Sequence, residues 1–382
     1  FLLDDIDFSG IGTIATLFDI ERVEVLRGPQ GSRYGANALA GLVYVQSTMP
    51  SREKAGRLQV TAGSDDTFAG GLAFGGPVTR DASVRYRLSA HHHQSNGFRD
   101  NTYLGRSDTN GRDETTLRGR LSADPSDTLS INLALMYTDI SNGYDAFAID
   151  NSYTMLSDKP GRDAQESIGG SLRFDWSGFA GHTLTSITAF ADSDIDFSFD
   201  ADWGNDDSWA PFTYDYVSIS DRTRRTLSQE FRLVSDSDKP FDYLLGLYAL
   251  RLDDELDTLN QGEYYDPFFD FADSLDARFS SDYEATNVAA FGQLGVELSD
   301  ATRLEFGLRV ERRSTNYSDS DGLMAGPSET MTGGEIALTH EHSEQFRSYV
   351  SLSRGYKAGG FNIGIGVPDD RREFGAEVLW NA

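Results

Sequence analysis

The segment that decides the fold is Arg303-Leu-Glu-Phe-Gly-Leu-Arg-Val-Glu311. Its even positions, Leu304, Phe306, Leu308 and Val310, are apolar, whereas its odd positions carry Arg, Glu or Gly. Successive side chains of an extended strand point to opposite faces. This segment therefore predicts a β-strand with an apolar stripe on one face and charged side chains on the other.

The same alternation recurs along the chain from about residue 57 onward. The alternating segments run to about ten residues, which exceeds the usual 5–6 of a globular strand and approaches the roughly 9–11 of a tilted membrane strand. No stretch of the sequence contains the roughly 20 apolar residues that a membrane helix needs. Further apolar stripes are Val84, Tyr86, Leu88 and Ala90; Leu129, Ile131, Leu133, Leu135 and Tyr137; Ile168, Leu172, Phe174 and Trp176; and Leu227, Phe231 and Leu233.

Short and long connections alternate between the predicted strands. Tight turns on one side and long loops on the other are typical of bacterial outer-membrane barrels. We count thirteen strands and the beginning of another at 372–382. Because a barrel cannot leave an edge open in lipid, we expect the complete barrel to need further strands. The short turns are 76–81, 124–127, 177–182, 235–240, 299–302 and 341–345, and the long polar segments are 91–114, 139–166, 192–225, 253–285 and 314–333.

Composition narrows the class of protein. The chain of 382 residues has a net charge of −28, which would repel nucleic acid. It contains no Cys, so disulfides and Cys-based metal sites are excluded. The sequence shows no nucleophile–base arrangement, no complete metal-binding pattern and no convincing dinucleotide motif. We therefore predict no catalytic residues, no metal, no cofactor and no enzymatic activity.

Residues 1–55 follow a different pattern from the rest of the chain. A short run at 20–26 is followed by the turn-rich segment Arg27-Gly-Pro-Gln-Gly31. One helical turn is expected at 36–40 and a strand at 42–46. The sequence thus predicts a small α+β region over 1–55 and a separate β-domain over 56–382.

Several long motifs resemble those of TonB-dependent outer-membrane receptors. Asp19-Ile-Glu-Arg-Val-Glu-Val-Leu-Arg-Gly-Pro-Gln-Gly-Ser-Arg-Tyr-Gly35, continued by 36–46, resembles the latter half of their plug domain, and Phe1-Leu-Leu-Asp-Asp-Ile6 resembles the preceding plug strand. Phe74-Gly-Gly-Pro-Val78 and Ser353-Arg-Gly-Tyr-Lys-Ala-Gly-Gly-Phe-Asn362 resemble barrel segments of the same family.

This resemblance implies an all-β transmembrane protein, an antiparallel up-and-down β-barrel of about 22 strands whose lumen is filled by a plug. Residues 1–55 would be the C-terminal part of that plug, and 56–382 the N-terminal part of the barrel. The first part of the plug and the last barrel strands would then lie outside this sequence.

The resemblance also implies a function: active transport of a scarce nutrient, most often a ferric siderophore, across the bacterial outer membrane. TonB, with ExbB and ExbD, would act on the plug from the periplasmic side, and the barrel would contact outer-membrane lipid and lipopolysaccharide. Uptake of a glycan or of cobalamin by the same mechanism stays open, as does a signal-transducing receptor. The plug-like residues 1–55 speak against a passive porin.

The plug motif supplies one set of candidate residues. Glu21, Arg22, Glu24 and Arg27 alternate along a strand and are expected to pair with charges on the inward faces of the barrel strands. The alternative is that the inward charges are simply solvated. Gly28, Pro29, Tyr34 and Gly35 are interpreted as turn residues, with ligand contact by Arg33 or Tyr34 as the alternative. The inward charges are Arg85, Arg87, Arg118, Arg120, Glu305 and Arg309.

Aromatic side chains in the long polar segments supply the second set, because rigid aromatic rings make good ligand contacts. The alternative is that they pack the loops together or lie in the interfacial girdle. These candidate ligand-binding residues are Trp203, Trp209, Tyr214, Tyr216, Tyr264, Tyr265 and Phe268, with Phe212, Phe269 and Phe271 beside them.

The charge of the same segments bears on the cargo. Segment 253–285 has eleven acidic residues and one Arg, and segment 192–225 has nine Asp and three Arg. If these acids line the vestibule, they disfavour a strongly anionic ferric catecholate and favour a neutral or cationic cargo, such as a hydroxamate complex, a cobalamin or a glycan. Alternatively, they face the metal-bridged lipopolysaccharide.

Overall fold

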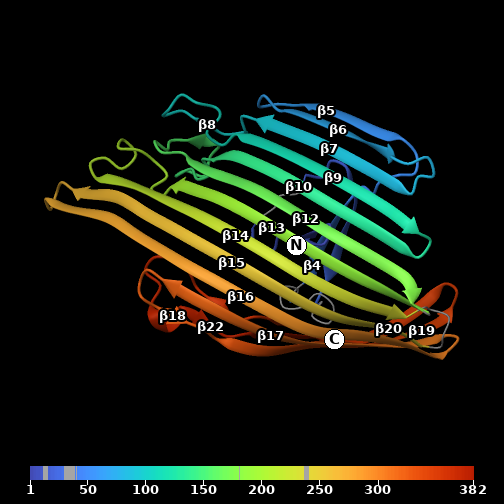
Figure 1. The fold of residues 1–382 in the computed structure, drawn as a ribbon. Helices are drawn as coiled ribbons and strands as arrows, with labels where there is room; N and C mark the ends of the chain where they lie inside the picture. The colour runs from blue at the N-terminus through green and yellow to red at the C-terminus, as the bar shows by residue number, and fades with distance from the viewer. Residues whose placement is uncertain (12–15, 30–38, 40, 180, 236–240) are drawn as a thin grey trace.

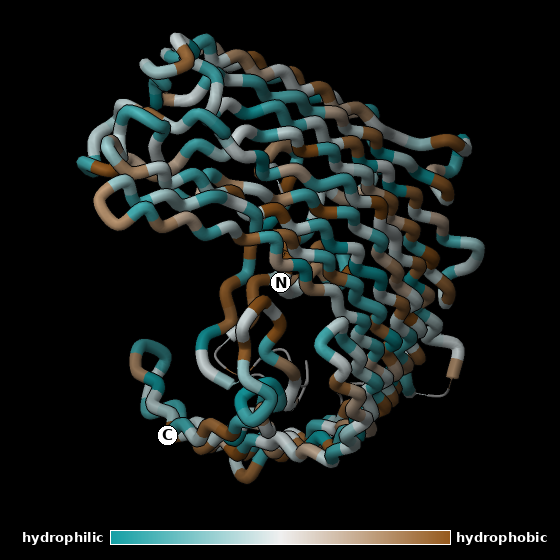
Figure 2. Tube along the Cα trace, turned by 90° about the vertical axis from the view of Figure 1, so that its left-hand side faces the viewer, coloured by the Kyte–Doolittle hydropathy of each residue, from teal (hydrophilic) through white to brown (hydrophobic). Residues whose placement is uncertain are grey.

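A large antiparallel sheet curves around a small four-stranded sheet (Figures 1 and 2). The computed structural model describes residues 1–11, 16–29, 39, 41–179, 181–235 and 241–382. The small sheet uses strands from the first 47 residues, and the large sheet begins at Ala55.

The small sheet has the strand order β2-β1-β4-β3. β1 pairs with β4 in parallel, and the other pairs are antiparallel. The strands predicted at 20–26 and 42–46 are confirmed, whereas the predicted helical turn at 36–40 lies outside the described residues except for Leu39. The strands are β1 (Leu2–Leu3), β2 (Ile6–Asp7), β3 (Ile20–Arg27) and β4 (Gly41–Ser47).

The large sheet is an up-and-down meander in which each main strand pairs with the next along the chain. Thirteen strands and a short fourteenth follow one another, as the sequence predicted. The partial antiparallel barrel is thereby confirmed. The main strands are β5 (Ala55–Ala62), β6 (Phe68–Pro77), β7 (Val84–Ser95), β9 (Arg112–Ser126), β10 (Leu129–Tyr144), β12 (Gly161–Phe179), β13 (His182–Asp200), β14 (Thr213–Ser235), β15 (Phe241–Asp266), β16 (Phe271–Ser299), β17 (Thr302–Asp319), β19 (Ser328–Ser343), β20 (Phe346–Lys357) and β23 (Glu377–Asn381).

Short elements occupy the longer connections. β8 and β11 pair with each other, β18 pairs with β17, and β21 pairs with β22. Among the described residues, none of the helical segments is long and apolar enough to cross a membrane. The short elements are β8 (Asp100–Asn101), β11 (Thr154–Met155), β18 (Met324–Ala325), β21 (Gly360–Phe361), the 3-10 turn η2 (Asp369–Arg371) and β22 (Glu373–Phe374).

The alternation in β17 separates two environments as predicted. Leu308 and Val310 on the outer face are 47% and 43% exposed, whereas Arg309 and Glu311 on the inner face are 2% and 1% exposed. An apolar outer face and a polar inner face are the arrangement typical of a barrel strand that spans a membrane.

The strands are longer than the sequence predicted. β15 and β16 have 26 and 29 residues, so the predicted long loop 253–285 is mostly paired strand and the link is only 267–270. The apolar outer stripe covers only the part of each strand next to the short turns. Beyond it, the outer face becomes polar, for example at Asp192 and Arg225, which are paired in register.

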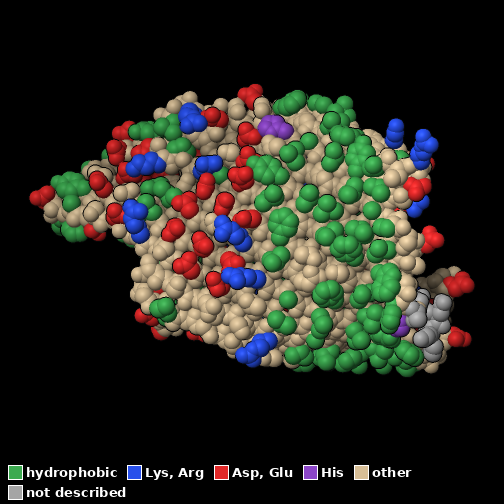
Figure 3. Space-filling view, in the orientation of Figure 1, with side chains coloured by type: hydrophobic (Ala, Val, Ile, Leu, Met, Phe, Trp, Pro, Cys, Tyr) green, Lys and Arg blue, Asp and Glu red, His purple; other side chains and the backbone are tan. Residues whose placement is uncertain are grey.

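The outer surface shows the same boundary (Figure 3). Apolar side chains cover the half next to the short turns, and charged side chains cover the half toward the long connections. The predicted strands were too short because the apolar alternation covers only part of each strand. The hydrogen-bonded pairing of the strands continues beyond the apolar stripe. The charged outer-face residues at the boundary between the apolar and the charged half are Asp192, Arg225, Arg251, Glu284 and Arg312.

Candidate functional site

Buried arginines of the barrel wall bind the small N-terminal sheet, which we call the plug sheet. Arg87 on β7 pairs with Asp19 through two hydrogen bonds, and the Arg87 Nε–Asp19 Oδ2 distance is 2.7 Å. Arg120 on β9 donates to Asp4 Oδ1 at 3.0 Å and to the Ser47 carbonyl at 2.8 Å. Arg87 and Arg120 lie opposite each other on neighbouring strands, so two adjacent cations hold two carboxylates of the plug.

Hydrogen bonds to neutral backbone carbonyls of the plug extend the contact between the plug sheet and the wall. Arg118 donates to the backbone carbonyls of Phe18 and Thr16, at 2.8 and 2.9 Å. Ser171 Oγ on β12 donates to the Asp4 carbonyl at 2.6 Å. Ion pairs do cross the boundary between the plug sheet and the wall, but their plug carboxylates are Asp4 and Asp19, which were not among the residues predicted to pair. These charge-assisted bonds are stronger than neutral ones.

An apolar cluster also crosses this boundary, which the expectation of a polar contact did not include. Leu3, Ile6, Phe8 and Ile11 of residues 1–11 pack in one buried cluster with Met136, Ala189 and Ala191 of the wall. The inner face of β13 is small and apolar at these positions because the plug excludes water from that part of the lumen.

Two wall glycines make space for plug rings. A Cβ atom at Gly169 would lie 2.9 Å from Cζ of Phe8, and one at Gly71 would lie 2.6 Å from Cε2 of Phe18. Contacts this short do not occur for real Cβ atoms, so each position depends on the absence of a side chain. Neither glycine was singled out from the sequence.

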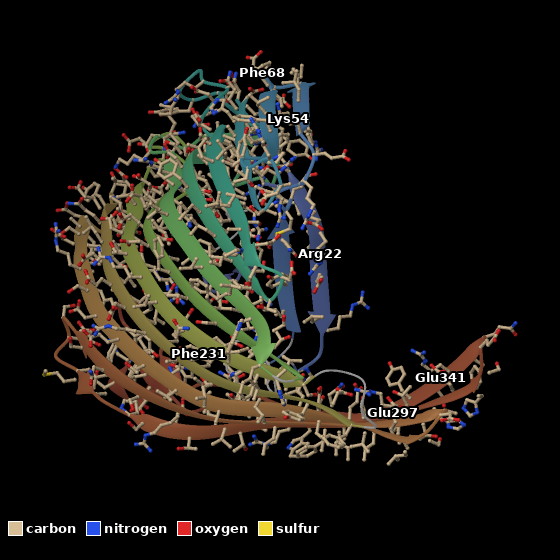
Figure 4. The ribbon with its side chains drawn as sticks, turned by 45° about the vertical axis from the view of Figure 1, so that its right-hand side comes forward. Arg22, Lys54, Phe68, Phe231, Glu297 and Glu341 are labelled. Atoms are coloured by element: carbon tan, nitrogen blue, oxygen red, sulfur yellow. The ribbon has the colours of Figure 1, made fainter. Side chains whose placement is uncertain are left out.

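The predicted plug-motif residues make other contacts. Arg22 pairs with Glu24 on the same strand at 2.5 Å, and Glu21 accepts a hydrogen bond from the Met49 amide at 3.2 Å. Figure 4 shows Arg22 on the plug sheet inside the curve of the wall. The wall arginines are instead bound by Asp4 and Asp19, which lie in the two quoted plug motifs.

Of the remaining residues of the motif, Arg27, Gly28 and Pro29 lie within the described part of the chain. Gly28 has a φ of +78°, which explains the preference for Gly there, and Pro29 lies against Gly355 of β20. Arg27 ends β3. Arg33, Tyr34 and Gly35 lie outside the described residues.

Other inward charges pair within the barrel wall. Arg85 donates to Asp124 at 2.7 Å. Arg309 donates to Glu311 at 2.9 Å, and Tyr356 donates to the same Glu311 at 2.8 Å. Glu305 accepts from Arg303 at 3.3 Å. Of these contacts, Arg85–Asp124 joins the neighbouring strands β7 and β9, and Tyr356–Glu311 joins β20 to β17 across β19. The two Arg–Glu pairs lie within β17.

Two adjoining cavities lie beyond the plug, on the side of the long connections. One, of about 500 Å³, lies between the plug residues Gly10 and Ile11 and the inner faces of β9 to β15. The other, of about 360 Å³, lies between β14 to β17 and residues 358–376, which we call the strap. The two cavities share Arg222, Leu256 and Ile363. Their size suits a small-molecule ligand.

The strap is fixed to the ends of β16 and β17. Arg372, which is 1% exposed, donates to Asp321 at 2.6 Å and pairs with Asp319 at 3.2 Å. Phe361 stacks on Tyr317 with ring centroids 4.0 Å apart. In Figure 1, β22 of the strap lies beside β18. The strap therefore forms a wall of the smaller cavity.

The predicted ligand-contacting aromatics pack mainly against one another. Tyr214 contacts the rings of Trp209, Tyr216 and Tyr264 at 5.5, 4.9 and 6.3 Å. Aromatic residues from 209–216 and from 264–271 thus form one cluster, at the far ends of β14 to β16. Phe212 joins it to Phe268, Trp203 stacks on Phe147, and Tyr265 donates to Asp270. These residues do not line the two cavities described above.

The acidic residues of the long segments point mainly outward, so the predicted acidic vestibule is wrong. On β13 and β14, Asp192, Asp194, Asp196 and Asp221 occupy outer-face positions, because they alternate with buried inward residues such as Ser193. Asp192 pairs with Arg225 on the outer face at 3.2 Å. Counting charges along a loop missed this because strand alternation divides them between two faces.

The connection between β13 and β14 contains a buried carboxyl pair. Asp202 accepts hydrogen bonds from the backbone amides of Gly204 and Tyr216, at 3.0 and 2.8 Å. Asp200, which is 5% exposed, lies beside it. Burial, and then the charge of Asp202, raises the pKa of Asp200 to about 8. In the described ranges no group of three or more His, Asp or Glu side chains is arranged to hold a metal ion.

Comparison with known protein families gives two matches. Residues 150–371 match the family described as TonB dependent receptor-like, beta-barrel, and residues 1–42 match the TonB-dependent Receptor Plug Domain. The pesticin receptor of Yersinia enterocolitica is 22% identical over 392 aligned positions, covering 99% of this chain and 55% of the relative. The metal-pseudopaline receptor CntO of Pseudomonas aeruginosa is 37% identical over 81 residues, 21% of this chain and 11% of the relative.

Solved structures show the same fold. The ferric yersiniabactin uptake receptor FyuA from Yersinia pestis aligns with a TM-score of 0.79 at 19% identity, over 94% of this chain and 56% of that one. The siderophore receptor PiuA from Acinetobacter baumannii aligns with a TM-score of 0.69 at 14% identity, over 89% and 55%. The chain thus spans about half the length of the relatives that it matches over nearly all of its own length.

Proposed function

Because this chain belongs to the TonB-dependent receptor family of the outer membrane, we propose that it takes part in the energy-dependent uptake of a ferric siderophore. Residues 1–55 are then the C-terminal part of the plug, and 56–382 the N-terminal part of the barrel. The carrying observation is the plug sheet, held inside the curved wall by Arg87 and Arg120, with ligand-sized cavities on its far side. Solved structures named as a ferric yersiniabactin uptake receptor and a siderophore receptor support an iron complex as cargo.

The arrangement fits an uptake mechanism that requires tight binding of the nutrient and then work to release it. A scarce nutrient must be bound tightly, and nanomolar affinity corresponds to roughly 12 kcal/mol, so release needs work. TonB, with ExbB and ExbD, supplies that work from the periplasmic side by pulling on the plug. The contacts of Asp4 and Asp19 resist this pull, and they can be replaced by water as the plug moves. The proposal assigns the chain a transport role and no catalytic reaction.

The residues predicted as site residues have different roles in the proposed function. The plug-motif residues, including Arg33, Tyr34 and Gly35, stay predicted gating residues. The loop aromatics stay predicted contacts for the first encounter with ligand, since they lie farthest from the plug. The apolar outer stripe is proposed to face lipid, and the charged ends of the strands to face lipopolysaccharide.

The test uses the complete receptor that contains this chain. It is produced in a host without siderophore receptors, and uptake of radioactive iron is measured with a panel of ferric siderophores, with and without TonB. We expect uptake of at least one complex that disappears without TonB. Uptake of cobalamin or of a glycan instead, or ligand-dependent gene activation without transport, would overturn the proposal in favour of the corresponding alternative.

A further inference from the structure

The cavity beneath the strap is cationic, although the chain as a whole is strongly acidic. Four cationic side chains line it, Arg222, Arg224, Arg313 and Lys357, against a single carboxylate, Asp254. On β13 and β14, Asp192, Asp194, Asp196 and Asp221 are on the outer face, as described above. The inner face of β14 thus places positive charge at the point where a ligand would approach the plug.

Two of these guanidinium groups share one counter-ion. Arg222 Nε donates to Asp254 Oδ1 at 2.7 Å, and Arg224 Nη1 donates to Asp254 Oδ2 at 2.6 Å. One carboxylate balances only one of the two positive charges. An excess charge in a half-buried site is unfavourable unless another anion is bound.

The third guanidinium has a neutral partner. Arg313 on β17 is 8% exposed and donates to the Tyr283 hydroxyl at 2.6 Å. The Nε atoms of Arg224 and Arg313 are buried and, within the described part of the chain, have no hydrogen-bond partner. Both side chains line the cavity, and their charge is delocalised over the whole guanidinium group, so each attracts an anion there.

Apolar side chains complete the lining. Leu250, Leu252 and Leu256 point inward from β15, and Phe361 and Phe374 come from the strap. A fully hydrophilic anion would leave these surfaces without a partner. A ligand with both an anionic group and an apolar or aromatic face would satisfy the whole cavity.

The cavity is also connected to the plug through Arg222. The same guanidinium that binds Asp254 donates to the Gly10 carbonyl of the plug at 3.3 Å. Lys357 at the start of the strap pairs with Glu377 at 3.6 Å, so its charge is partly compensated. Among the cations that line the cavity, Arg224 thus shares one carboxylate with Arg222, and Arg313 is hydrogen-bonded to a neutral hydroxyl.

We infer that this cavity binds an anionic, partly apolar ferric chelate, whose oxyanion lies between Arg224 and Arg313. This inference rests on the proposed function and replaces the neutral or cationic cargo expected from loop composition. Arg suits this role because its planar group keeps its charge and binds carboxylate-like or phenolate oxygens in a fixed geometry.

The test measures binding to the purified complete receptor in detergent, using two iron complexes of similar size. One is an anionic ferric tris-catecholate, and the other is a neutral ferric trihydroxamate. Arg224→Gln and Arg313→Gln should each weaken binding of the anionic complex by roughly tenfold to a hundredfold, the loss expected for a charge-assisted hydrogen bond, and leave the neutral complex unaffected.

Arg225→Gln is the matched control, because Arg225 is the next residue and faces outward, where it pairs with Asp192. It should leave both affinities unchanged. Arg224→Lys keeps the charge and should retain most of the binding. Heat-modifiable gel migration verifies that each variant forms the barrel.

The possible results distinguish failure of the proposed function from failure of the anionic site. If the neutral complex is bound and imported with TonB while the anionic complex is not, the proposed function stands and the anionic site is overturned. Equal losses for Arg224→Gln and Arg225→Gln would also overturn the site. If the wild type binds neither complex, the inference fails, whereas the proposed function is decided by the uptake panel described above.

Discussion

Arg87 and Asp19, 68 positions apart in the sequence, form a buried ion pair that joins the barrel wall to the plug sheet. The side chains are 9% and 4% exposed. Removing one partner of a buried pair leaves an uncompensated charge and typically costs about 3–5 kcal/mol. This pair is therefore a main contributor to the seal between plug and wall.

Arg87→Gln should loosen the plug and increase the leak of small solutes through the complete receptor in liposomes. Hydrogen exchange in β1 to β4 should rise in parallel. Arg85→Gln is the control, since Arg85 pairs with Asp124 inside the wall and that change leaves the ion pair between Arg87 and Asp19 intact. Equal leak from both variants would contradict a sealing role for Arg87.

Gly71→Ala should destabilise the docking of the plug, because its Cβ would lie 2.6 Å from the Phe18 ring. Overpacking of this kind costs about 1–3 kcal/mol. Gly70→Ala is the control, since a Cβ at Gly70 meets nothing within 4 Å. Thermal unfolding in detergent and leak measurements check the difference, and Phe18→Leu should partly rescue Gly71→Ala. Identical behaviour of the two glycine variants would count against the packing argument.

The pKa of Asp200, raised to about 8 by burial and by Asp202, predicts a pH-sensitive outer connection. The folded state binds the proton more tightly than the unfolded state, in which the pKa of an Asp is near its ordinary value of 3.8. Local stability is therefore greatest at low pH and falls as pH rises toward 8, with a limiting slope of about 1.4 kcal/mol per pH unit.

Asp200→Asn should remove this dependence and increase protection of residues 201–212 at pH 8, measured by hydrogen exchange. Asp150→Asn in the neighbouring connection is the control, because Asp150 is exposed and its pKa is lowered. A wild-type connection whose protection does not change between pH 5 and pH 9, once intrinsic exchange is corrected, would refute the prediction.

Leu308→Arg should impair barrel assembly, because Leu308 lies in the apolar outer stripe of β17. An Arg facing the middle of the bilayer costs about 2–4 kcal/mol. Asn316→Arg, on the same face but beyond the polar boundary, should be tolerated. Refolding yield into lipid vesicles measures both. If Asn316→Arg were the more damaging change, the placement of the membrane along the strand would be wrong.

Sequence periodicity was sufficient to predict the strands, their antiparallel order and the positions of the turns. Each strand of a barrel carries its own signal: an apolar stripe at every second residue where lipid touches it, then a tight turn. The plug strands were likewise predicted, through motifs such as Ile20–Arg27. These features depend on residues that are close together in the sequence, so the pattern of residues along the chain can predict them.

What the tertiary structure alone decided is which distant residues meet. Asp4 and Asp19 were visible in the plug motifs, yet no local pattern shows that they, and not Glu21 or Glu24, would reach Arg120 and Arg87. The acidic segments looked like an acidic vestibule until pairing of β13, β14 and β15 assigned their charges to faces. The cationic cavity then arises because side chains from four strands and a strap converge in space, and convergence depends on the curvature and register of the sheet, which hydropathy along the chain does not encode.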